Sequence, residues 1–363
     1  MPVHRIGTYA EHGLSPELVW EFLEEASEAG CRTVVDPFVG SGVVAVEAQE
    51  RCVDFVGVDS NPWSLVLTAA KTTRLDANYV LESFDGALDA ARSLGPLVPS
   101  PLLAKYHGPR ALEALGVLRR AVELAPAKAR PLLLATLAPI AYRRSRLRKT
   151  PAPRLIGPGD GDASSIASEY RALLARNLND LSSHRFCGSV ALVQADSTAW
   201  LPRRVCGVIT SPPFANNVDY VRHTMLELLW AGLARDSDDL GLLRGAQVPG
   251  CEACARTWRG RSADPEVEAL LSKVGGRRAD GYRRYLAQYF AAMESHVALL
   301  AERLEWRAWY TVGDSFVGGA YVPAHLILAR IAERLGLRAR VRAVGERMRP
   351  GRALYLVEMS ARA

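Results

Sequence analysis

The chain has 363 residues, of which 49% are hydrophobic and 23% are charged, a composition that excludes disordered and fibrous proteins. No apolar run reaches the length of a membrane span, and the amino terminus is polar from His4 onward. We therefore expect neither a signal peptide nor a membrane anchor, and we predict a cytoplasmic protein.

The formal net charge is +6, and all but five of the 45 basic residues are arginines. The planar guanidinium group suits phosphate groups and guanine edges better than the point charge of lysine does, so this bias permits a nucleic-acid partner. A GC-rich or heat-adapted genome would produce the same bias, and both interpretations stay open.

Six cysteines are spaced irregularly in a chain without a secretion signal, and we expect most of them to be buried thiols. Only Cys251 and Cys254 have the spacing of metal ligands, and no second pair or nearby histidines complete a tetrahedral zinc site. We predict no metal there, and either a local disulfide or two plain thiols.

Helices and strands alternate at the beginning of the chain. Ser15 and Pro16 are typical of a helix start, and the apolar spacing continues to Gly30. A strand then ends at Asp36, a helix follows over Val43–Arg51, and a second strand, Asp54–Asp59, ends in an acidic residue. Asp59 lies 23 residues after Asp36, a spacing at which dinucleotide-binding folds place the carboxylate that binds ribose hydroxyls.

Two apolar runs break abruptly into turn residues, as buried parallel strands do at their carboxyl ends. The run at Val34–Gly42 ends in glycines, which let the backbone approach a ligand closely. The run at Val208–Phe214 ends in a Ser-Pro-Pro-Phe corner. Because ligands bind at the carboxyl edge of open α/β sheets, we expect both turns to contribute to one site.

From Ala77 to Cys187 the strand pattern disappears, and leucine and alanine recur at helical spacing, which predicts a helical insertion. A loop rich in Gly, Pro, Asp and Ser is predicted over 151–165. Before it comes a basic run over 143–149, either a solvated helix end or an arm that contacts phosphates. We favour the arm, because the interrupted sheet has catalytic motifs. Its basic residues are Arg143, Arg144, Arg146, Arg148 and Lys149.

The strand pattern resumes over 189–196 and 204–211, and a loop-rich region is expected over 235–280. Further helices are predicted over 221–234, 282–304 and 324–335, and further strands over 305–314, 338–344 and 353–359. The whole pattern predicts an α/β fold with one open, mostly parallel sheet of about seven strands. Its two halves, residues 1–76 and 188–363, would flank the helical insertion, residues 77–187.

The Asp-Pro-Phe-Val-Gly-Ser-Gly loop (Asp36–Gly42) and the Ser-Pro-Pro-Phe corner (Ser211–Phe214) resemble motifs of S-adenosylmethionine-dependent amino-methyltransferases of the N4-cytosine/N6-adenine type. In that family the loop binds the methyl donor and the corner holds the target base. Tyr9–Glu21 and Val312–Ser315 resemble further segments of the family. Thr210–Tyr220 is similar to a subgroup whose corner continues into Asn-x-x-Asp-Tyr. These matches span most of the chain outside the insertion.

The resemblance implies a Rossmann-like class I methyltransferase fold and assigns three groups of residues. The donor, S-adenosyl-L-methionine, would contact Tyr9, Asp36, Pro37, Phe38, Gly40, Gly42, Asp59, Asp196 and Ser197. Catalysis would depend on Ser211, Pro212, Pro213 and Phe214. The nucleic acid would contact Asn217, Asp219, Tyr220 and Arg222, together with Arg143, Arg144, Arg146 and Arg148 of the basic run.

The chemistry of the corner follows from its residue types. An exocyclic amine of cytosine or adenine is a poor nucleophile, because its lone pair is delocalised into the ring. Two acceptors directed at the amine hydrogens, the Ser211 hydroxyl and the Pro212 carbonyl, would point that lone pair at the methyl group. Phe214 would stack on a base presented outside a helix. Serine at the first position favours cytosine N4, and phenylalanine replaces the commoner tyrosine at the last.

Other interpretations stay open. Pro-Pro after a strand is often only a loop, Asp59 and Asp196 are possible helix caps, and Asp219 with Arg222 is a possible helix start with a surface charge. We expect DNA as the substrate, with ribosomal or other RNA, adenine N6 and a protein amide as alternatives. A non-catalytic nucleic-acid-binding protein is a further alternative. Carbon-5 methylation of cytosine is excluded, because no cysteine follows a proline.

Overall fold

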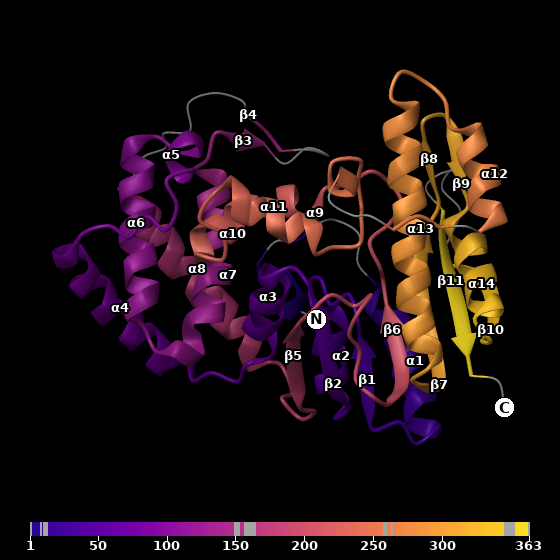
Figure 1. Ribbon diagram of the computed structural model, residues 1–363. Helices are drawn as coiled ribbons and strands as arrows, with labels where there is room; N and C mark the ends of the chain where they lie inside the picture. The colour runs from indigo at the N-terminus through magenta and orange to yellow at the C-terminus, as the bar shows by residue number, and fades with distance from the viewer. Residues whose placement is uncertain are drawn as a thin grey trace.

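The computed structural model describes residues 2–7, 9, 14–148, 153–155, 165–256, 260–262, 264–344 and 353–361. Seven strands form one sheet in the order β10-β11-β7-β6-β1-β2-β5, and helices cover both of its faces (Figure 1). Its strands are β1 (Thr33–Asp36), β2 (Asp54–Asp59), β5 (Val190–Gln194), β6 (Val205–Thr210), β7 (Leu304–Gly313), β10 (Arg338–Ala343) and β11 (Leu354–Ser360).

The sheet is mostly parallel, which confirms the predicted α/β class. β11 runs antiparallel to both of its neighbours, β7 and β10, whereas the pairs β1·β2, β1·β6, β2·β5 and β6·β7 are parallel. The order differs from the usual dinucleotide-binding order at one edge, where the last strand is inserted between the two that precede it in the chain. All seven predicted strands are present in this sheet, each within two residues of its expected bounds.

Alternating side chains of the central strands face opposite layers of helices, as the period of a strand requires. Val34 and Ile209 pack in one core cluster with α1 (Pro16–Glu28) and α2 (Val43–Glu50). Their neighbours Val35 and Val208 pack in another, with the helices of the opposite face. Those helices are α12 (Pro265–Lys273), α13 (Ala279–Ala301) and α14 (Ala324–Arg334).

A third core cluster joins the middle of the chain to helices that pack on the sheet. It extends from helices of the segment 77–187 to α3 and α10, so these helices share one apolar core. Figure 1 shows the helices of this segment gathered on the side of the sheet where β5 lies. Its helices are α3 (Pro62–Thr72), α4 (Ala77–Leu94), α5 (Leu103–Tyr106), α6 (Pro109–Leu124), α7 (Arg130–Arg143), α8 (Ile166–Ser182) and α10 (Met225–Ala231).

Four expectations need correction. The segment 77–187 contains a hairpin, β3 (Leu147–Arg148) with β4 (Arg154–Leu155), too short to give a pattern. A second hairpin, β8 (Ser315–Val317) with β9 (Ala320–Val322), was not expected. The region 235–280 contains α11 (Ser237–Gly245) and α12, which begin at the capping carboxylates of Asp236 and Asp264. The helix predicted over 221–234 is divided at Thr224 into α9 (Tyr220–His223) and α10.

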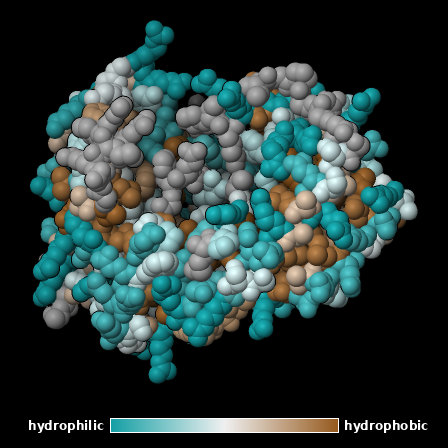
Figure 2. All heavy atoms as spheres, turned by 180° about the vertical axis from the view of Figure 1, so that it is seen from behind, coloured by the Kyte–Doolittle hydropathy of each residue, from teal (hydrophilic) through white to brown (hydrophobic). Residues whose placement is uncertain are grey.

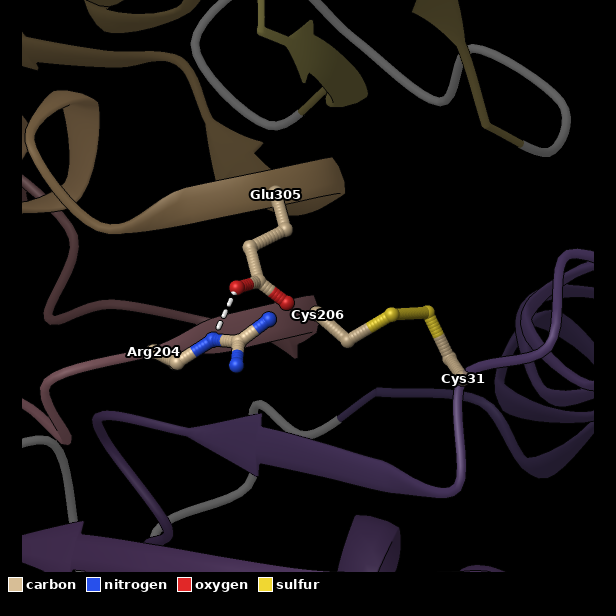
Figure 3. Close-up of a disulfide and its surroundings, with 4 residues drawn as sticks. All are labelled: Cys31, Arg204, Cys206 and Glu305. Carbon is tan, nitrogen blue, oxygen red and sulfur yellow. Dashed lines mark hydrogen bonds and ion pairs between the residues drawn. A yellow bond between two sulfur atoms is a disulfide. The ribbon is translucent and has the colours of Figure 1, made fainter.

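The expectation of free thiols is wrong for four of the six cysteines. Cys31 is bonded to Cys206, and Cys52 is bonded to Cys187. Each disulfide joins the segments at the amino ends of two adjacent parallel strands, β1 with β6 and β2 with β5, and Figure 3 shows the first of them. The partners are 175 and 135 residues apart, so no sequence spacing indicates the pairing.

Reduction of the disulfides is expected to destabilise the protein without changing the site at the opposite edge of the sheet. In the chain-entropy model a crosslink over either separation contributes about 5 kcal/mol, and the sum is smaller because one loop lies inside the other. Urea unfolding with and without dithiothreitol measures this loss. A protein whose free energy of unfolding is unchanged by reduction would contradict these pairings.

No helix of the described residues is long and apolar enough to cross a membrane. On the face seen in Figure 2, hydrophilic and hydrophobic residues are interspersed.

Candidate active site

A pocket opens where the parallel strands β1, β2 and β6 end. β1 lies between β2 and β6, so the chain crosses to opposite sides of it at this point, where open α/β sheets bind ligands. The pocket contains about 830 Å³ of empty space, part of it open to solvent. Thirteen predicted site residues line it: Tyr9, Asp36, Pro37, Phe38, Gly40, Asp59, Asp196, Ser197, Ser211, Pro212, Pro213, Phe214 and Tyr220.

Asp36 connects the two motifs. Its Oδ1 accepts hydrogen bonds from the Thr210 hydroxyl (2.5 Å) and from the backbone N–H of Phe38 (3.0 Å). The residue is 2% exposed, and burial raises the pKa of its carboxyl to about 7, although both hydrogen bonds lower it. The pocket thus holds a carboxylate that ionises near neutral pH.

Asp59 fixes the glycine loop rather than capping a helix. Its Oδ2 accepts a hydrogen bond from the backbone N–H of Gly40 (3.0 Å), and its Oδ1 accepts one from that of Asn61 (2.8 Å). Asn61, not Asp59, caps α3. Burial raises the pKa of Asp59, opposed by these hydrogen bonds. The ring of Tyr9 lies against Gly40, and its hydroxyl accepts a hydrogen bond from Ser64 (3.2 Å).

Gly42 does not line the pocket; it starts α2 in the left-handed conformation, with φ of 78°. A Cβ atom there would lie 2.6 Å from the hydroxyl of Thr68, which itself donates to the Ser64 carbonyl (2.8 Å). Nearby, the ammonium group of the buried Lys71 donates to the Ser41 carbonyl (2.7 Å), and burial lowers its pKa to about 7. The hydrogen bond from Lys71 to Ser41 fixes the end of the loop.

Gly42→Ala is therefore expected to lower the free energy of unfolding by about 2–4 kcal/mol, since the conformational strain and the contact with Thr68 add. Gly30→Ala is the matched control, because Gly30 has φ of 81° but no atom within 4 Å of the added Cβ. We expect it to cost only about 1 kcal/mol. Urea unfolding of both variants measures the difference. Equal losses would show that Thr68 moves aside.

Three tyrosines hold the Ser-Pro-Pro-Phe corner. The Tyr289 hydroxyl donates to the Pro213 carbonyl (2.9 Å), and the Tyr220 hydroxyl accepts from the backbone N–H of Phe214 (3.3 Å). The Tyr285 hydroxyl accepts from the backbone N–H of Asn217 (3.3 Å). Burial raises the pKa of all three, that of Tyr220 to about 12, so they are neutral donors and acceptors.

The two acceptors expected to orient the amine are available. No described residue donates a hydrogen bond to the Pro212 carbonyl, and none pairs with the Ser211 hydroxyl, whereas the neighbouring Pro213 carbonyl is occupied by Tyr289. The ring of Phe214 is 8% exposed and packs against Gly313 of β7, where a Cβ atom would lie 2.9 Å from it. Stacking of Phe214 on a base stays a prediction.

A buried histidine supports the third wall of the pocket. His296 Nδ1 donates to the Ser197 carbonyl (2.8 Å), and its Nε2 accepts from the Tyr310 hydroxyl (2.6 Å). Burial lowers the pKa of His296 to about 4, which keeps the ring neutral. In the neighbouring residue, Asp196, the Oδ1 atom accepts hydrogen bonds from the backbone N–H (2.9 Å) and the hydroxyl (2.8 Å) of Thr198. These bonds form a local turn, and Asp196 lines the pocket.

Three residues assigned to the substrate lie outside this pocket. Asp219 caps α9 through the backbone N–H of Arg222 (2.9 Å) and pairs with Arg244 (2.9 Å). Asn217 has φ of 61°, and its Oδ1 accepts from the backbone N–H of Glu252 (3.0 Å). Arg222 donates to the Pro153 carbonyl (3.0 Å). The helix-start interpretation is confirmed for Asp219.

The arginines of the basic run do not act as one surface. Arg143 and Arg144 both pair with Glu169 of α8, at 2.5 and 2.9 Å. Arg146 is partly buried, Arg148 is exposed on β3, and Lys149 lies outside the described residues. Two of the four described arginines thus already have a partner.

Asp219, Cys251 and Cys254 form the one cluster of metal-ligand type among the described residues, with ligand atoms within 4.8 Å of one another. The two cysteines are buried, with sulfur atoms 2.7 Å apart. The Arg244 guanidinium pairs with the Asp219 carboxylate. A cation already neutralises the only carboxylate of the cluster, which suits a metal poorly.

The sequence did not indicate that Thr210 donates a hydrogen bond to Asp36. Nor did it indicate four other residues that support the walls of the pocket: Lys71, Tyr285, Tyr289 and His296. Tyr285 and Tyr289 lie one turn apart on α13, a spacing that reads as ordinary helix core. No spacing connects α13 to a corner about 70 residues earlier.

Comparison of the chain with protein families and with curated proteins gives no match.

Proposed function

We propose that the protein is an S-adenosylmethionine-dependent methyltransferase that methylates an exocyclic amine of a nucleic-acid base, cytosine N4 in DNA first. One observation carries the proposal: the Asp36 loop and the Ser211 corner, 175 residues apart, line one pocket at the switch point of the sheet. The sheet order is compatible with the class I methyltransferase fold that the resemblance implies.

The pocket suits a cationic donor. Asp36 and Asp59 lie in it with pKa values raised by burial, and the negative charge of Asp59 raises the pKa of Asp36 further. A positively charged ligand would relieve the cost of ionising these buried carboxylates. S-Adenosylmethionine has a sulfonium and an ammonium group and supplies an activated methyl group when bound. Asp59 and the glycine loop would hold its ribose and amino-acid parts.

The corner would act by orientation. The Ser211 hydroxyl and the Pro212 carbonyl would accept the two amine hydrogens, while Tyr289 and Tyr220 keep the corner rigid through Pro213 and Phe214. Because the methyl group is already activated, positioning supplies most of the catalysis. Methylation would leave a positive charge on the exocyclic nitrogen, which would then lose one of its two protons to water in the pocket, part of which is open to solvent. This proton is acidic, so the step needs no strongly basic group.

A methyl-transfer assay tests the proposal, with labelled donor and three substrates: duplex DNA, single-stranded DNA and ribosomal RNA. Labelled products are digested to nucleosides and identified by mass. N4-methyldeoxycytidine is expected. N4-methylcytidine from RNA alone, or N6-methyladenine, would keep the donor site and reassign the substrate. Donor binding without transfer to any nucleic acid would exclude the proposed substrate class, and no donor binding would favour a non-catalytic protein.

A further inference from the structure

A second groove lies on the other side of the short helix α9. Tyr220 of α9 lines the pocket, whereas Arg222, two residues later, lines the groove together with Asp219. The opposite wall includes Leu147 and Arg154 of the β3–β4 hairpin, which Figure 1 places near α11 and α10. The groove contains about 1410 Å³ of empty space, part of it open to solvent. One helix therefore separates the two sites.

The groove has an excess of positive charge. Four cationic residues line it, Lys105, Arg154, Arg222 and Arg244, against the single carboxylate of Asp219. That carboxylate is already paired with Arg244 and bonded to the start of α9. Lys105, Arg154 and Arg222 are exposed, and none of them forms an ion pair with a described residue.

The β3–β4 hairpin holds two cations side by side, an arrangement that folding alone would not favour. Arg148 and Arg154 are directly opposite in the β3–β4 pair, and like charges at opposite positions destabilise such a pair. Arg222 joins the hairpin to α9 through the Pro153 carbonyl (3.0 Å). By contrast, Arg143 and Arg144 share the carboxylate of Glu169, which offsets one of their two charges. Arg154 and Arg222 thus bring cations without an ion-pair partner among the described residues to the groove, whereas Arg143 and Arg144 at the end of α7 are held by Glu169.

We infer that this groove binds the phosphodiester backbone of the nucleic-acid strand beside the target nucleotide, an inference that rests on the proposed function. The cations come from α5, β4 and α9, so they are spread along a surface and suit a chain of phosphates rather than one anion. Arginine forks match phosphate oxygens in pairs. Leu155, 53% exposed, supplies apolar area for sugars. Phosphates held here would leave the neighbouring nucleotide within reach of the corner across α9.

The test compares two double variants of the full chain with the same net charge. Lys105→Gln/Arg154→Gln removes two groove cations. Arg92→Gln/Arg171→Gln removes two exposed cations of α4 and α8 that are paired with Asp89 and Asp85. Binding of fluorescein-labelled duplex and single-stranded oligonucleotides is measured from 50 to about 300 mM salt.

For the groove variant, the slope of log K against log salt is expected to fall by about 1.8 for duplex and about 1.4 for single strands. Affinity at low salt should fall at least about tenfold. The control variant should keep the slope of the wild type. Donor affinity, measured by calorimetry, should be the same in all three proteins.

Other outcomes would overturn the inference. Equal losses in both variants would indicate a general effect of net charge. The groove variant could instead keep the salt slope of the wild type while the wild-type protein binds the oligonucleotide and transfers methyl groups. That result would place the phosphates elsewhere and leave the proposed function unchanged. If polyglutamate displaced the labelled oligonucleotide as effectively as unlabelled oligonucleotide does, the groove would be assigned to an acidic protein instead. A wild-type protein that binds donor but no oligonucleotide would contradict both the groove and the proposed function.

Discussion

Ser211→Ala is expected to lower kcat by about 100-fold or more while donor affinity stays within a factor of two of the wild type. The hydroxyl lines the pocket and pairs with no described residue, so its removal leaves the fold intact and takes away one of the two acceptors of the target amine. Loss of orientation at the reacting atom has effects of this size. Single-turnover methyl transfer gives the rate, and calorimetry gives donor affinity.

The matched control for Ser211→Ala is Ser60→Ala, a second pocket serine at the end of β2, outside the corner. We expect it to retain most of the methyl-transfer rate. A large loss of donor binding in Ser211→Ala would move this serine from the substrate to the donor. A rate similar to that of the wild type would leave the corner without its proposed chemistry.

Donor affinity is expected to rise with pH through about 7. In the donor-free protein the Asp36 pKa is about 7, above its usual 3.8, so the carboxyl is protonated below that pH. A cationic ligand binds the ionised form more tightly and releases a proton. The dissociation constant should thus increase up to tenfold per pH unit as the pH falls below 7. Calorimetry in buffers of different ionisation enthalpy measures the released proton.

Asp36→Asn separates this effect from other titrations. An asparagine Oδ1 can still accept the hydrogen bonds from Thr210 and Phe38, so the loop should keep its shape. We expect the donor to bind at least about tenfold more weakly at pH 8, with little change of affinity between pH 6 and 8. A variant with the same pH dependence as the wild type would assign the titration to another group.

The same substitution is expected to increase the stability of the protein at pH 8, although it weakens donor binding. Since the pKa of Asp36 is raised in the folded protein, folding favours its protonated form, and this contribution is present below about pH 4 and is lost as the pH rises through 7. An asparagine has no charge to bury, so Asp36→Asn should unfold at higher urea concentration than the wild type at pH 8. Greater stability with weaker donor binding is the pattern expected of a functional residue.

The sequence determined the sheet and the ends of its central strands. Each strand has a local apolar pattern followed by turn residues. The carboxyl ends of parallel strands lie at the same edge of a sheet, so these turns meet there regardless of the conformation of the connecting loops. For that reason Asp36, Asp59, Asp196 and Ser211 could be placed at one site without a structure. Ser15 and Pro16 likewise indicated the start of α1, where the Ser15 side chain accepts a hydrogen bond from the backbone N–H of Leu18.

Only the tertiary structure decided the contacts that depend on packing between distant segments. The bond from Thr210 to Asp36, the support of Pro213 by Tyr289 and the pairing of Cys31 with Cys206 join residues 76 to 175 positions apart. The charge of the basic run was visible in the sequence, but the pairing of Arg143 and Arg144 with Glu169 was not. Sequence patterns record the environment of a residue along its own element, whereas pKa values, ion pairs and grooves depend on which other elements pack against it.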